Sequence, residues 1–440
     1  MADTIRVEAL TRVEGHGGIL VRFEDGRPTA VELRIFEPPR FFEALLRGRP
    51  FSDAPDLTAR ICGICPVAYQ ITACIAMESA LGIEIDEPIR KLRRLLYCGE
   101  WIQSHALHMF MLHAPDFLGF HDFFQMADAF PDMVDDALAL KKIGNRIMRV
   151  LGGREIHPIN VKVGGFYRVP SRSEVDGLLP DLEAALPRIM EHTVELAKSV
   201  QTSISPSRIL VALRHPHEYP ISEGRLVSNH GMDISADEFE DRFEERQLER
   251  STALYCTLDS MTYACGPLSR INLNFDRLGA EARETATRAG FQVPISNPFS
   301  SIVARGLEVV QATSDAIAIA REYAPPDRAS VPFDVRAGSG AACTEAPRGV
   351  LFHRYALDDD GVITDAKIVP PTSQNQGAIE EDLWALAPSL PSRPKDEATR
   401  LAEQSVRNHD PCISCATHLV DLEFETRTGR TPGPTESRGD

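Results

Sequence analysis

The sequence predicts an α+β fold in which helix is dominant. Strand-like runs occupy residues 5–36, and long segments with the apolar spacing of helices fill much of the chain behind them. The 440 residues are 43% apolar and 25% charged, which is typical of a globular protein that buries a large core. No internal repeat or shift in composition marks a domain boundary.

The first predicted element is a β-hairpin. The run IRVEAL alternates between apolar and polar residues, and two further β-rich runs lie within GGILVRFEDGRPTAVELRIF. Asp25 and Gly26 stand between these two runs, and this dipeptide is typical of a two-residue hairpin turn. We therefore expect the flanking runs to pair.

Helices are predicted in most of the chain that follows. The unbroken apolar run 64–81 indicates a buried helix, and Asp86 and Pro88 form a helix start with an acidic residue and a first-turn proline. Pro180 and Pro187 should kink or split the helix that contains them. The predicted helices cover residues 40–48, 64–81, 86–111, 132–151, 173–200, 236–250 and 299–322.

Other segments give weaker signals. The helix at 236–250 is highly charged, so we expect it to be solvated. Residues 256–275 and 350–369 are predicted to be β-rich or irregular, and 385–396, with its Pro and Ser residues, a loop. The last dozen residues have almost no apolar content and should be disordered.

The charge balance limits the partners. Lys and Arg total 47 and Asp and Glu total 64, which gives a net charge of −17. The electrostatic field of a protein with this negative charge repels polyanions, so we expect no nucleic acid partner. The N-terminus has no signal-peptide pattern, and no run of 18 apolar residues occurs. We therefore expect a cytoplasmic protein that does not insert into a membrane.

Two cysteine pairs are the strongest chemical signal among the nine cysteines. Cys62 and Cys65 form one C-x-x-C pair, and Cys412 and Cys415 form the other. This spacing lets two thiolates reach one soft metal ion, so four thiolates could share a metal site. A structural zinc site, an iron–sulfur cluster and a thioredoxin-like redox pair are the alternatives. The long separation of the pairs disfavours a structural zinc site.

The residues around both pairs resemble the large, catalytic subunit of NiFe hydrogenases. The resemblance extends from about residue 5 to residue 418. Its motifs are RVEGH at 12–16, RICGICPVAY at 60–69, Ser104-His105 with His108 and Asp116, EAPRG at 345–349, NQG at 375–377 and DPCISCATH at 410–418. Within the family the chain looks like the soluble bidirectional NAD(P)-linked enzymes, including the sulfhydrogenases.

The resemblance implies a single domain over 1–418, with a central bundle of long helices and a small N-terminal β region. It also implies that 419–440 is an extension that a C-terminal endopeptidase removes on maturation. One departure from the family is Tyr69, where many members have histidine.

For the metals, the resemblance implies a Ni–Fe centre whose iron carries CO and cyanide. Cys62 and Cys412 would be terminal nickel ligands, and Cys65 and Cys415 would bridge nickel and iron. Cys412 would also take the proton from H2, and Glu14 would carry it onward. Without the family, Glu14 would be an ordinary solvated carboxylate.

Further site residues are implied in the same way. Arg348 would lie over the open side of the metals and contact a cyanide, with Asp116 pairing near it. Pro371 and Thr372 would line the cyanides.

A second metal site, for magnesium or a similar ion, would use Glu43, Gln376 and His418. Oxygen ligands suit such an ion. From the sequence alone, Glu43 could equally be an exposed helix residue.

The implied activity is reversible cleavage of H2 by the catalytic subunit of a soluble hydrogenase. Electrons would pass through an iron–sulfur small subunit to diaphorase-type subunits that bind flavin, iron–sulfur clusters and NAD(P), and maturation proteins would build the centre. An H2-sensing regulatory subunit, a metal-free scaffold and a structural metal protein are the alternatives. The other cysteines are expected to be buried apolar residues, and His105 and His108 packed helix histidines.

Overall fold

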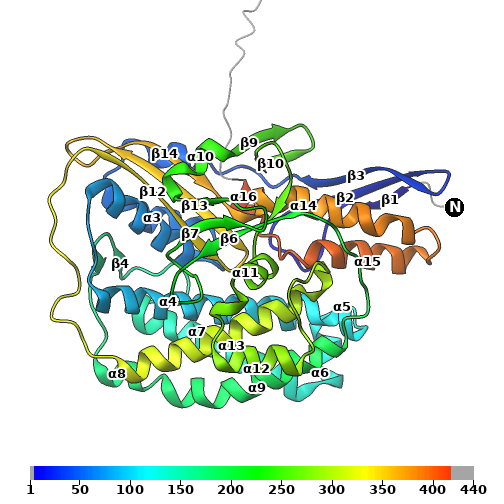
Figure 1. Ribbon diagram of the computed structural model, residues 1–440, viewed down its shortest axis with the longest axis horizontal. Helices are drawn as coiled ribbons and strands as arrows, with labels where there is room; N and C mark the ends of the chain where they lie inside the picture. The colour runs from blue at the N-terminus through cyan, green and yellow to red at the C-terminus, as the bar shows by residue number, and fades with distance from the viewer. Residues whose placement is uncertain (1–3, 418–440) are drawn as a thin grey trace, which may run out of the picture.

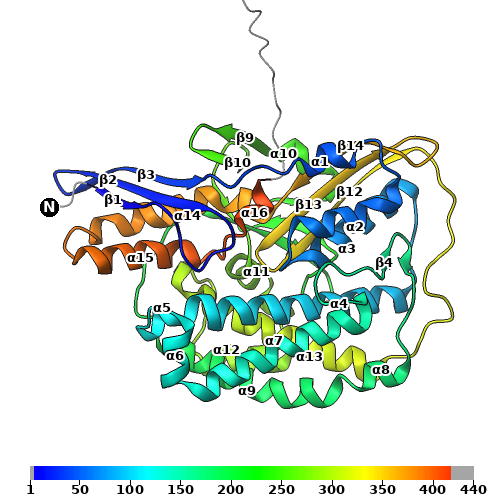
Figure 2. The same cartoon turned by 180° about the vertical axis from the view of Figure 1, so that it is seen from behind.

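A computed structural model describes residues 4–417 of the chain. Its long helices form one layer and its sheets, with the remaining helices, form a second layer above it (Figures 1 and 2). This arrangement confirms the helix-dominated α+β prediction. The described residues include no helix that is long and apolar enough to cross a membrane.

The helical layer consists of long helices packed against one another. The helices are α4 (Glu87–Ala106), α7 (Pro131–Gly152), α9 (Leu179–Lys198), α12 (Ala280–Arg288) and α13 (Ser301–Glu322). Helices α4 and α7 cross closely because both carry glycine at the crossing. A Cβ added to Gly144 would lie 2.5 Å from the backbone oxygen of Gly99. Below 3 Å something would have to move, so this contact depends on the missing side chains.

Helix α4 does not end where an ordinary helix would. It continues through a π-helical segment, Leu107–His113, into α5 (Ala114–Leu118). The predicted helix at 86–111 is therefore confirmed. It continues to Leu118, and its middle segment has the wider turns of a π-helix. The predicted helix at 173–200 is split, since α8 (Arg172–Asp176) stops and α9 begins just before Pro180.

The N-terminal hairpin is confirmed. Strands β1 (Thr4–Val7), β2 (Gly17–Glu24) and β3 (Arg27–Ile35) form an antiparallel sheet. Asp25 and Gly26 both have positive φ, as a two-residue hairpin turn requires. The sheet packs on α14 (Pro371–Leu386) and α15 (Lys395–Arg407), so the two ends of the chain lie together.

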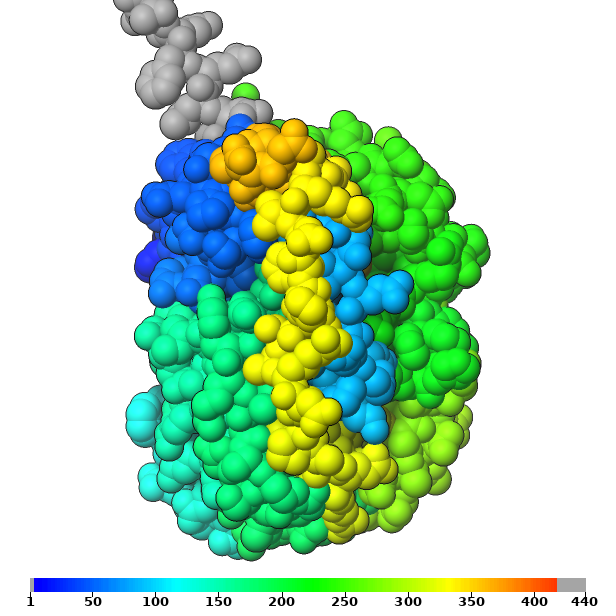
Figure 3. All heavy atoms as spheres, turned by 90° about the vertical axis from the view of Figure 1, so that its left-hand side faces the viewer, coloured from blue at the N-terminus to red at the C-terminus, as the bar shows by residue number. Residues whose placement is uncertain are grey.

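A second three-stranded sheet supports the centre of the molecule. Strands β12 (Gly338–Ala346), β13 (Gly349–Leu357) and β14 (Ile363–Val369) pair in order, and α3 (Pro66–Leu81) packs on them. The segment 323–337, which connects α13 to β12, runs over the face shown in Figure 3 without forming a helix or strand. Most of α3 is buried, as its apolar sequence predicts.

Smaller sheets complete this layer. A four-stranded sheet has the order β11 (Tyr263–Ala264), β6 (Ile209–Arg214), β7 (Arg225–Ser228) and β8 (Asp233–Ile234). The two-stranded pairs are β9 (Phe243–Leu248) with β10 (Ser251–Leu258), and β4 (Val161–Lys162) with β5 (Gly165–Phe166). The short helices are α1 (Phe42–Leu46), α2 (Ala54–Thr58), α6 (Phe123–Ala129), α10 (Phe239–Arg242), α11 (Pro267–Asn274) and α16 (Ile413–Ala416).

The predicted helix at 236–250 is wrong. Only α10 is helical after a short 3-10 turn, and the chain then forms β9. The ring of Phe243 stacks on Phe239, which in turn stacks on Phe352 of β13, with both centroid distances 4.2 Å. This apolar contact with a distant strand, rather than the local pattern of charged residues, determines the conformation of the segment.

The expectation that all of 256–275 is β-rich or irregular is also wrong, because α11 lies within it.

The chain between α14 and α15 includes a 3-10 turn, Ala387–Ser389, and otherwise agrees with the predicted loop at 385–396. The expected disorder of the last dozen residues, and the extension 419–440, lie outside the described residues.

Candidate metal centre

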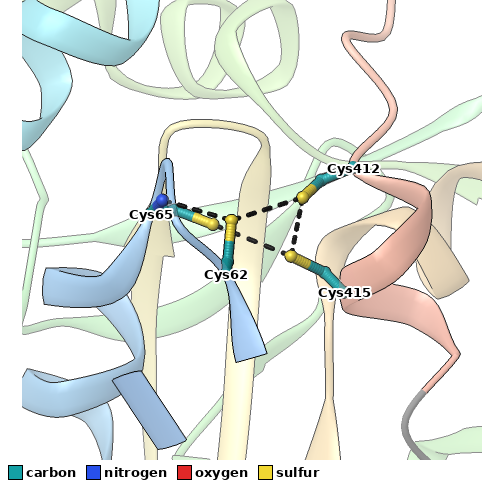
Figure 4. Close-up of side chains that lie close together, drawn as sticks. All are labelled: Cys62, Cys65, Cys412 and Cys415. Carbon is teal, nitrogen blue, oxygen red and sulfur yellow. Dashed lines mark hydrogen bonds between the residues drawn. The ribbon is translucent and has the colours of Figure 1, made fainter. Parts of the chain in front are cut away.

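Four cysteine side chains meet in the interior (Figure 4). Their Sγ atoms all lie within 4.8 Å of one another, and all four residues are buried. Cys62 Sγ lies 3.5 Å from Cys412 Sγ, and Cys65 Sγ lies 3.8 Å from Cys415 Sγ. Both distances join residues 350 positions apart in the sequence. Among residues 4–417 this is the one cluster of three or more such groups arranged to bind a metal.

Local backbone geometry aims each pair of sulfurs inward. The backbone N–H groups of Ile64 and Cys65 point to Cys62 Sγ, at 3.3 and 3.2 Å. Cys65 is the N-cap residue of α3, and Cys412 is the N-cap residue of α16. Each C-x-x-C pair is therefore a tight turn into a helix, which places both thiols on the same side.

A buried carboxylate that no sequence motif predicts holds the first turn. Glu100 of α4 accepts hydrogen bonds from the backbone N–H groups of Val67 and Ala68, at 2.6 and 3.0 Å. These are orphan donors at the start of α3. Burial raises the pKa of Glu100 well above its ordinary value, although both hydrogen bonds oppose the shift.

Glu14 links the N-terminal segment to the second pair. Its Oε2 accepts hydrogen bonds from Cys412 Sγ at 3.3 Å and from the backbone N–H of Ser414 at 2.9 Å. Its carbonyl oxygen accepts from the N–H of Ile413 at 2.9 Å. Gly15 has φ +89°, and a Cβ there would lie 2.7 Å from the Cβ of Ile413. The glycine therefore permits this close approach.

Arg348 is a buried cation beside the cluster. Its Nε and Nη2 donate to the backbone oxygen and Oδ1 of Asp410, at 2.9 and 3.1 Å, and its Nη1 donates to Ser104 Oγ at 3.4 Å. Burial opposes the charge, but Asp410 and the cysteine thiols outweigh burial and raise the pKa of Arg348 above its ordinary value. Ser104 belongs to a motif of the family resemblance, but no local pattern in the sequence predicts this contact.

Another arginine holds the turn that presents Arg348. Arg270, which is fully buried, donates to the carbonyl oxygens of Ala346 and Pro347, at 2.8 and 2.9 Å. Its guanidinium also forms ion pairs with Glu308 at 2.6 Å and Glu345 at 2.9 Å. Because these contacts fix two successive carbonyls before Arg348, the turn has little freedom.

Asp116 has partners other than the expected one. Its carboxylate forms ion pairs with Arg12 and Arg407, and the Arg407 Nε–Oδ2 distance is 2.7 Å. Arg348 pairs instead with Asp410. The contacts of Asp116 therefore tie the N-terminal segment and α15 to α5.

Thr372 lies beside the second cysteine pair. Its Oγ1 accepts a hydrogen bond from the backbone N–H of Cys412 at 3.0 Å. Pro371 and Thr372 are the first residues of α14, and both are buried. The start of this helix therefore packs against the cluster.

Of the proposed magnesium ligands, two lie within the described residues. Glu43 is buried on α1 and accepts from the backbone N–H of Ile368 at 2.7 Å, and burial raises its pKa to about 7. Gln376 is buried on α14 and accepts from Ser251 Oγ at 3.1 Å. His418 lies outside the described residues. The chain reaches this neighbourhood, because Thr417 O accepts from the backbone N–H of Arg40 at 2.9 Å.

The two helix histidines have protein partners. His105 Nε2 lies 3.1 Å from Glu308, and His108 Nε2 lies 2.9 Å from the backbone oxygen of Arg407. Both are packed helix residues, as predicted. The remaining cysteines are also buried as predicted: Cys74, Cys98, Cys256, Cys265 and Cys343.

The donor set fits a nickel–iron group. Four buried thiols are soft ligands, and burial raises the pKa of both Cys412 and Cys415. Four thiolates this close repel one another unless a multivalent cation binds them. Arg348 supplies one positive charge beside them, which leaves most of that charge for a metal to balance.

Comparisons with known proteins agree with this chemistry. A family model described as nickel-dependent hydrogenase matches residues 40–132. The chain is 34% identical to sulfhydrogenase 1 subunit alpha of Pyrococcus furiosus, over 95% of this chain and 98% of that protein. It is 32% identical to sulfhydrogenase 2 subunit alpha of the same organism, over 95% and 100%. A crystal structure of an NAD+-reducing [NiFe]-hydrogenase in the H2-reduced state superposes with a TM-score of 0.85 and 27% identity, over 94% of this chain and 99% of that one.

Proposed function

The chain belongs to the nickel-dependent hydrogenases, as one of their large, catalytic subunits, and from this premise we propose that it cleaves H2 reversibly and heterolytically at a Ni–Fe centre. The observation that carries the proposal is the contact of Glu14 with Cys412. A buried thiol and a carboxylate 3.3 Å apart form the start of a route by which a proton can leave the cluster.

In this proposal the thiolates of Cys62, Cys65, Cys412 and Cys415 would hold the nickel–iron group. CO and cyanide would be further ligands of its iron. When bound, the centre supplies the metal chemistry that polarises and splits H2. The four residues come from two tight turns, and backbone N–H groups of the first turn hold Cys62 Sγ in place.

The chain's own residues manage the proton and the charge. Cys412 Sγ receives the proton and passes it to Glu14 Oε2, which is held by the N–H of Ser414. Glu14 is only partly buried, so its carboxylate connects the buried thiol to the protein surface. A positioned acid–base group of this kind is worth about 10²- to 10⁴-fold in rate.

Arg348 and Thr372 also lie beside the cluster. Arg348 places a fixed positive charge there, where it balances thiolate charge and can donate to an anionic ligand such as cyanide. Thr372 holds the backbone of Cys412, and Pro371 adds an apolar surface beside it. Asp116 is proposed to act through Arg12 and Arg407, by fixing the segment that carries Glu14.

We also propose a magnesium or similar ion bound by Glu43, Gln376 and His418. The buried carboxylate of Glu43, with a pKa raised to about 7, would gain from a nearby divalent cation. Removal of 419–440 after metal insertion, with 1–418 as one domain, belongs to the same proposal.

The electrons require partners. Within residues 4–417 the other five cysteines are buried singly and form no second cluster. We propose an iron–sulfur small subunit and diaphorase-type subunits with flavin and NAD(P), in line with the NAD+-reducing enzyme that this chain resembles. Maturation proteins would deliver the metals. Nine free, buried cysteines favour the reducing cytoplasm.

Metal analysis of the purified complex, together with infrared spectroscopy, tests the function. Nickel is expected, with iron in excess of it because the partner subunits add iron–sulfur clusters, together with infrared bands from CO and cyanide. H2-dependent reduction of NAD and of NADP should then be compared in the same preparation. Zinc alone in the chain, with no infrared bands, would contradict the proposal. An intact centre without H2-dependent reduction of either carrier would favour an H2-sensing subunit.

A further inference from the structure

A cavity away from the cysteine cluster has an unusual charge. It has a volume of about 280 Å³ and lies among the starts of β6 and α11, the segment 294–298, and residues of α13 and the chain before Cys412. Arg208, Arg305 and His409 line it, together with serine and asparagine side chains. No carboxylate is among the lining residues, although the chain has a net charge of −17.

Arg305 sets this cavity apart from other buried sites. Its side chain is 1% exposed, its Nη1 donates to the backbone oxygen of Asn408 at 3.0 Å, and its Nε has no hydrogen-bond partner in the described part of the chain. None of the carboxylates within residues 4–417 lies within 4.0 Å of its guanidinium. A buried guanidinium without such a partner is unusual.

The other buried arginines show the contrast. Each has a carboxylate at ion-pair distance: Arg93 with Glu78, Arg94 with Asp315, Arg270 with Glu308 and Glu345, Arg348 with Asp410, and Arg407 with Asp116. Arg305 therefore departs from a pattern that the rest of the interior follows. Burial, reinforced by Arg348, lowers the pKa of Arg305 to about 10, in spite of Asp410 and Glu308.

The other two basic side chains of the lining have carboxylate partners. Arg208 pairs with Asp382 and also lies 3.9 Å from Glu381 Oε2, and the His409 Nε2–Asp382 Oδ2 distance is 2.7 Å. Of the three basic side chains in the lining, Arg305 is the one without a carboxylate at ion-pair distance in the described part of the chain. An anion in the cavity would therefore be attracted to Arg305 rather than to Arg208 or His409.

We propose that this cavity binds a small oxyanion, with the guanidinium of Arg305 as its principal partner. The planar guanidinium presents donors that suit a carboxylate or phosphate oxygen. The hydroxyl groups of Ser207 and Ser296 line the same space and would complete the binding. The volume accommodates phosphate or a short carboxylate.

The site lies next to the segment that serves the cluster. Arg305 holds the backbone of Asn408, two residues before Asp410, which pairs with Arg348. A bound oxyanion would thus tie down the chain that leads to Cys412. The inference does not depend on the bound metals, because every residue in it lies outside the cysteine cluster.

Calorimetric titration of the purified full-chain complex with inorganic phosphate, and separately with acetate, tests the site at constant ionic strength. Ser296 lies at an exposed part of the lining, so substitution there should leave the fold intact. We expect one saturable site in the wild type and in Ser296→Asn. Ser296→Asp should weaken binding about tenfold or more, since its carboxylate repels the anion and competes for Arg305.

Binding of phosphate, acetate or both with this difference between the variants supports the site, and the preferred anion identifies the class. Arg305→Gln provides a second, direct measurement and should abolish binding. The proposal is overturned if the wild type binds neither anion, or if Ser296→Asp binds as tightly as Ser296→Asn. The titration measures anion binding and not activity toward H2, so its failure would not contradict the proposed function.

Discussion

Glu14 and Cys412 are 398 positions apart in the sequence, yet the carboxylate of one accepts a hydrogen bond from the thiol of the other at 3.3 Å. The same carboxylate oxygen is fixed by the N–H of Ser414 at 2.9 Å. The N-terminal segment therefore contributes a proton acceptor to a turn at the opposite end of the chain. Contacts between the two ends of the chain are thus part of the site.

Replacement of Glu14 by glutamine should remove the proton carrier and keep the hydrogen bond from Ser414. We expect H2 oxidation to fall about 100-fold or more, because proton transfer by a positioned group is lost. Nickel and iron content should stay at the wild-type level. Glu14→Asp, which keeps the carboxylate at a longer distance, should retain more activity. Equal activity of Glu14→Gln and the wild type would rule out this route.

The buried cysteines should separate into two classes. Cys415→Ala removes one of four converging thiols, so we expect the purified chain to lose nickel and iron. Cys98→Ala removes a thiol that is equally buried but lies outside the cluster, and metal content should be unchanged. Elemental analysis of both variants checks the difference. Full metal content in Cys415→Ala would mean that the cluster is not the site.

The sequence was sufficient for the parts of this site that depend on local patterns. Both C-x-x-C turns, the segment with Glu14 and the turn with Arg348 are short motifs, and the structure brings them together. Contacts between distant segments were not predictable, because no local pattern shows which residue meets Glu100 or Arg270. The charged segment 236–250 shows the same limit, since it pairs with β10 and stacks Phe239 against the distant Phe352.

The crossing of α4 and α7 should not tolerate a side chain. In Gly144→Ala the new Cβ would lie 2.5 Å from Gly99 O and 2.6 Å from the N of Gln103, both backbone atoms. Alanine favours an isolated helix by about 1 kcal/mol, so a loss of stability would come from the crossing itself. We expect a loss of about 1–3 kcal/mol, as for other overpacked cores.

Thermal unfolding of Gly144→Ala measures this effect. Asp135→Ala, on the exposed face of the same helix, is the matched control and should unfold close to the wild-type temperature. If Gly144→Ala is more stable than the wild type, the helices are not in the close contact that the structure shows.

Arg270 should be essential for both stability and the position of Arg348. Arg270→Met would leave the carboxylates of Glu308 and Glu345 buried without their cation and free two carbonyls before Arg348. Breaking a buried ion pair in this way costs about 3–5 kcal/mol. A strong fall in the unfolding temperature is expected. The exposed pair of Arg288 and Glu191 is the control, and Arg288→Met should behave like the wild type.

Buried His105 should make the protein sensitive to acid. Burial lowers its pKa to about 4, which Glu308 opposes and Arg270 and Arg305 reinforce. The unfolded chain binds a proton at the ordinary value of 6.5, so between pH 6.5 and about 4 the unfolded state holds more protons than the folded state. The free energy of unfolding therefore carries no penalty from His105 above pH 6.5, and below that pH it falls because of this residue by at most about 3 kcal/mol.

In His105→Gln, which keeps a donor near Glu308, the unfolding temperature should decline less steeply over this range. The surface variant His121→Gln should follow the wild type, and an identical slope in His105→Gln would show that this histidine is not the acid-sensitive group.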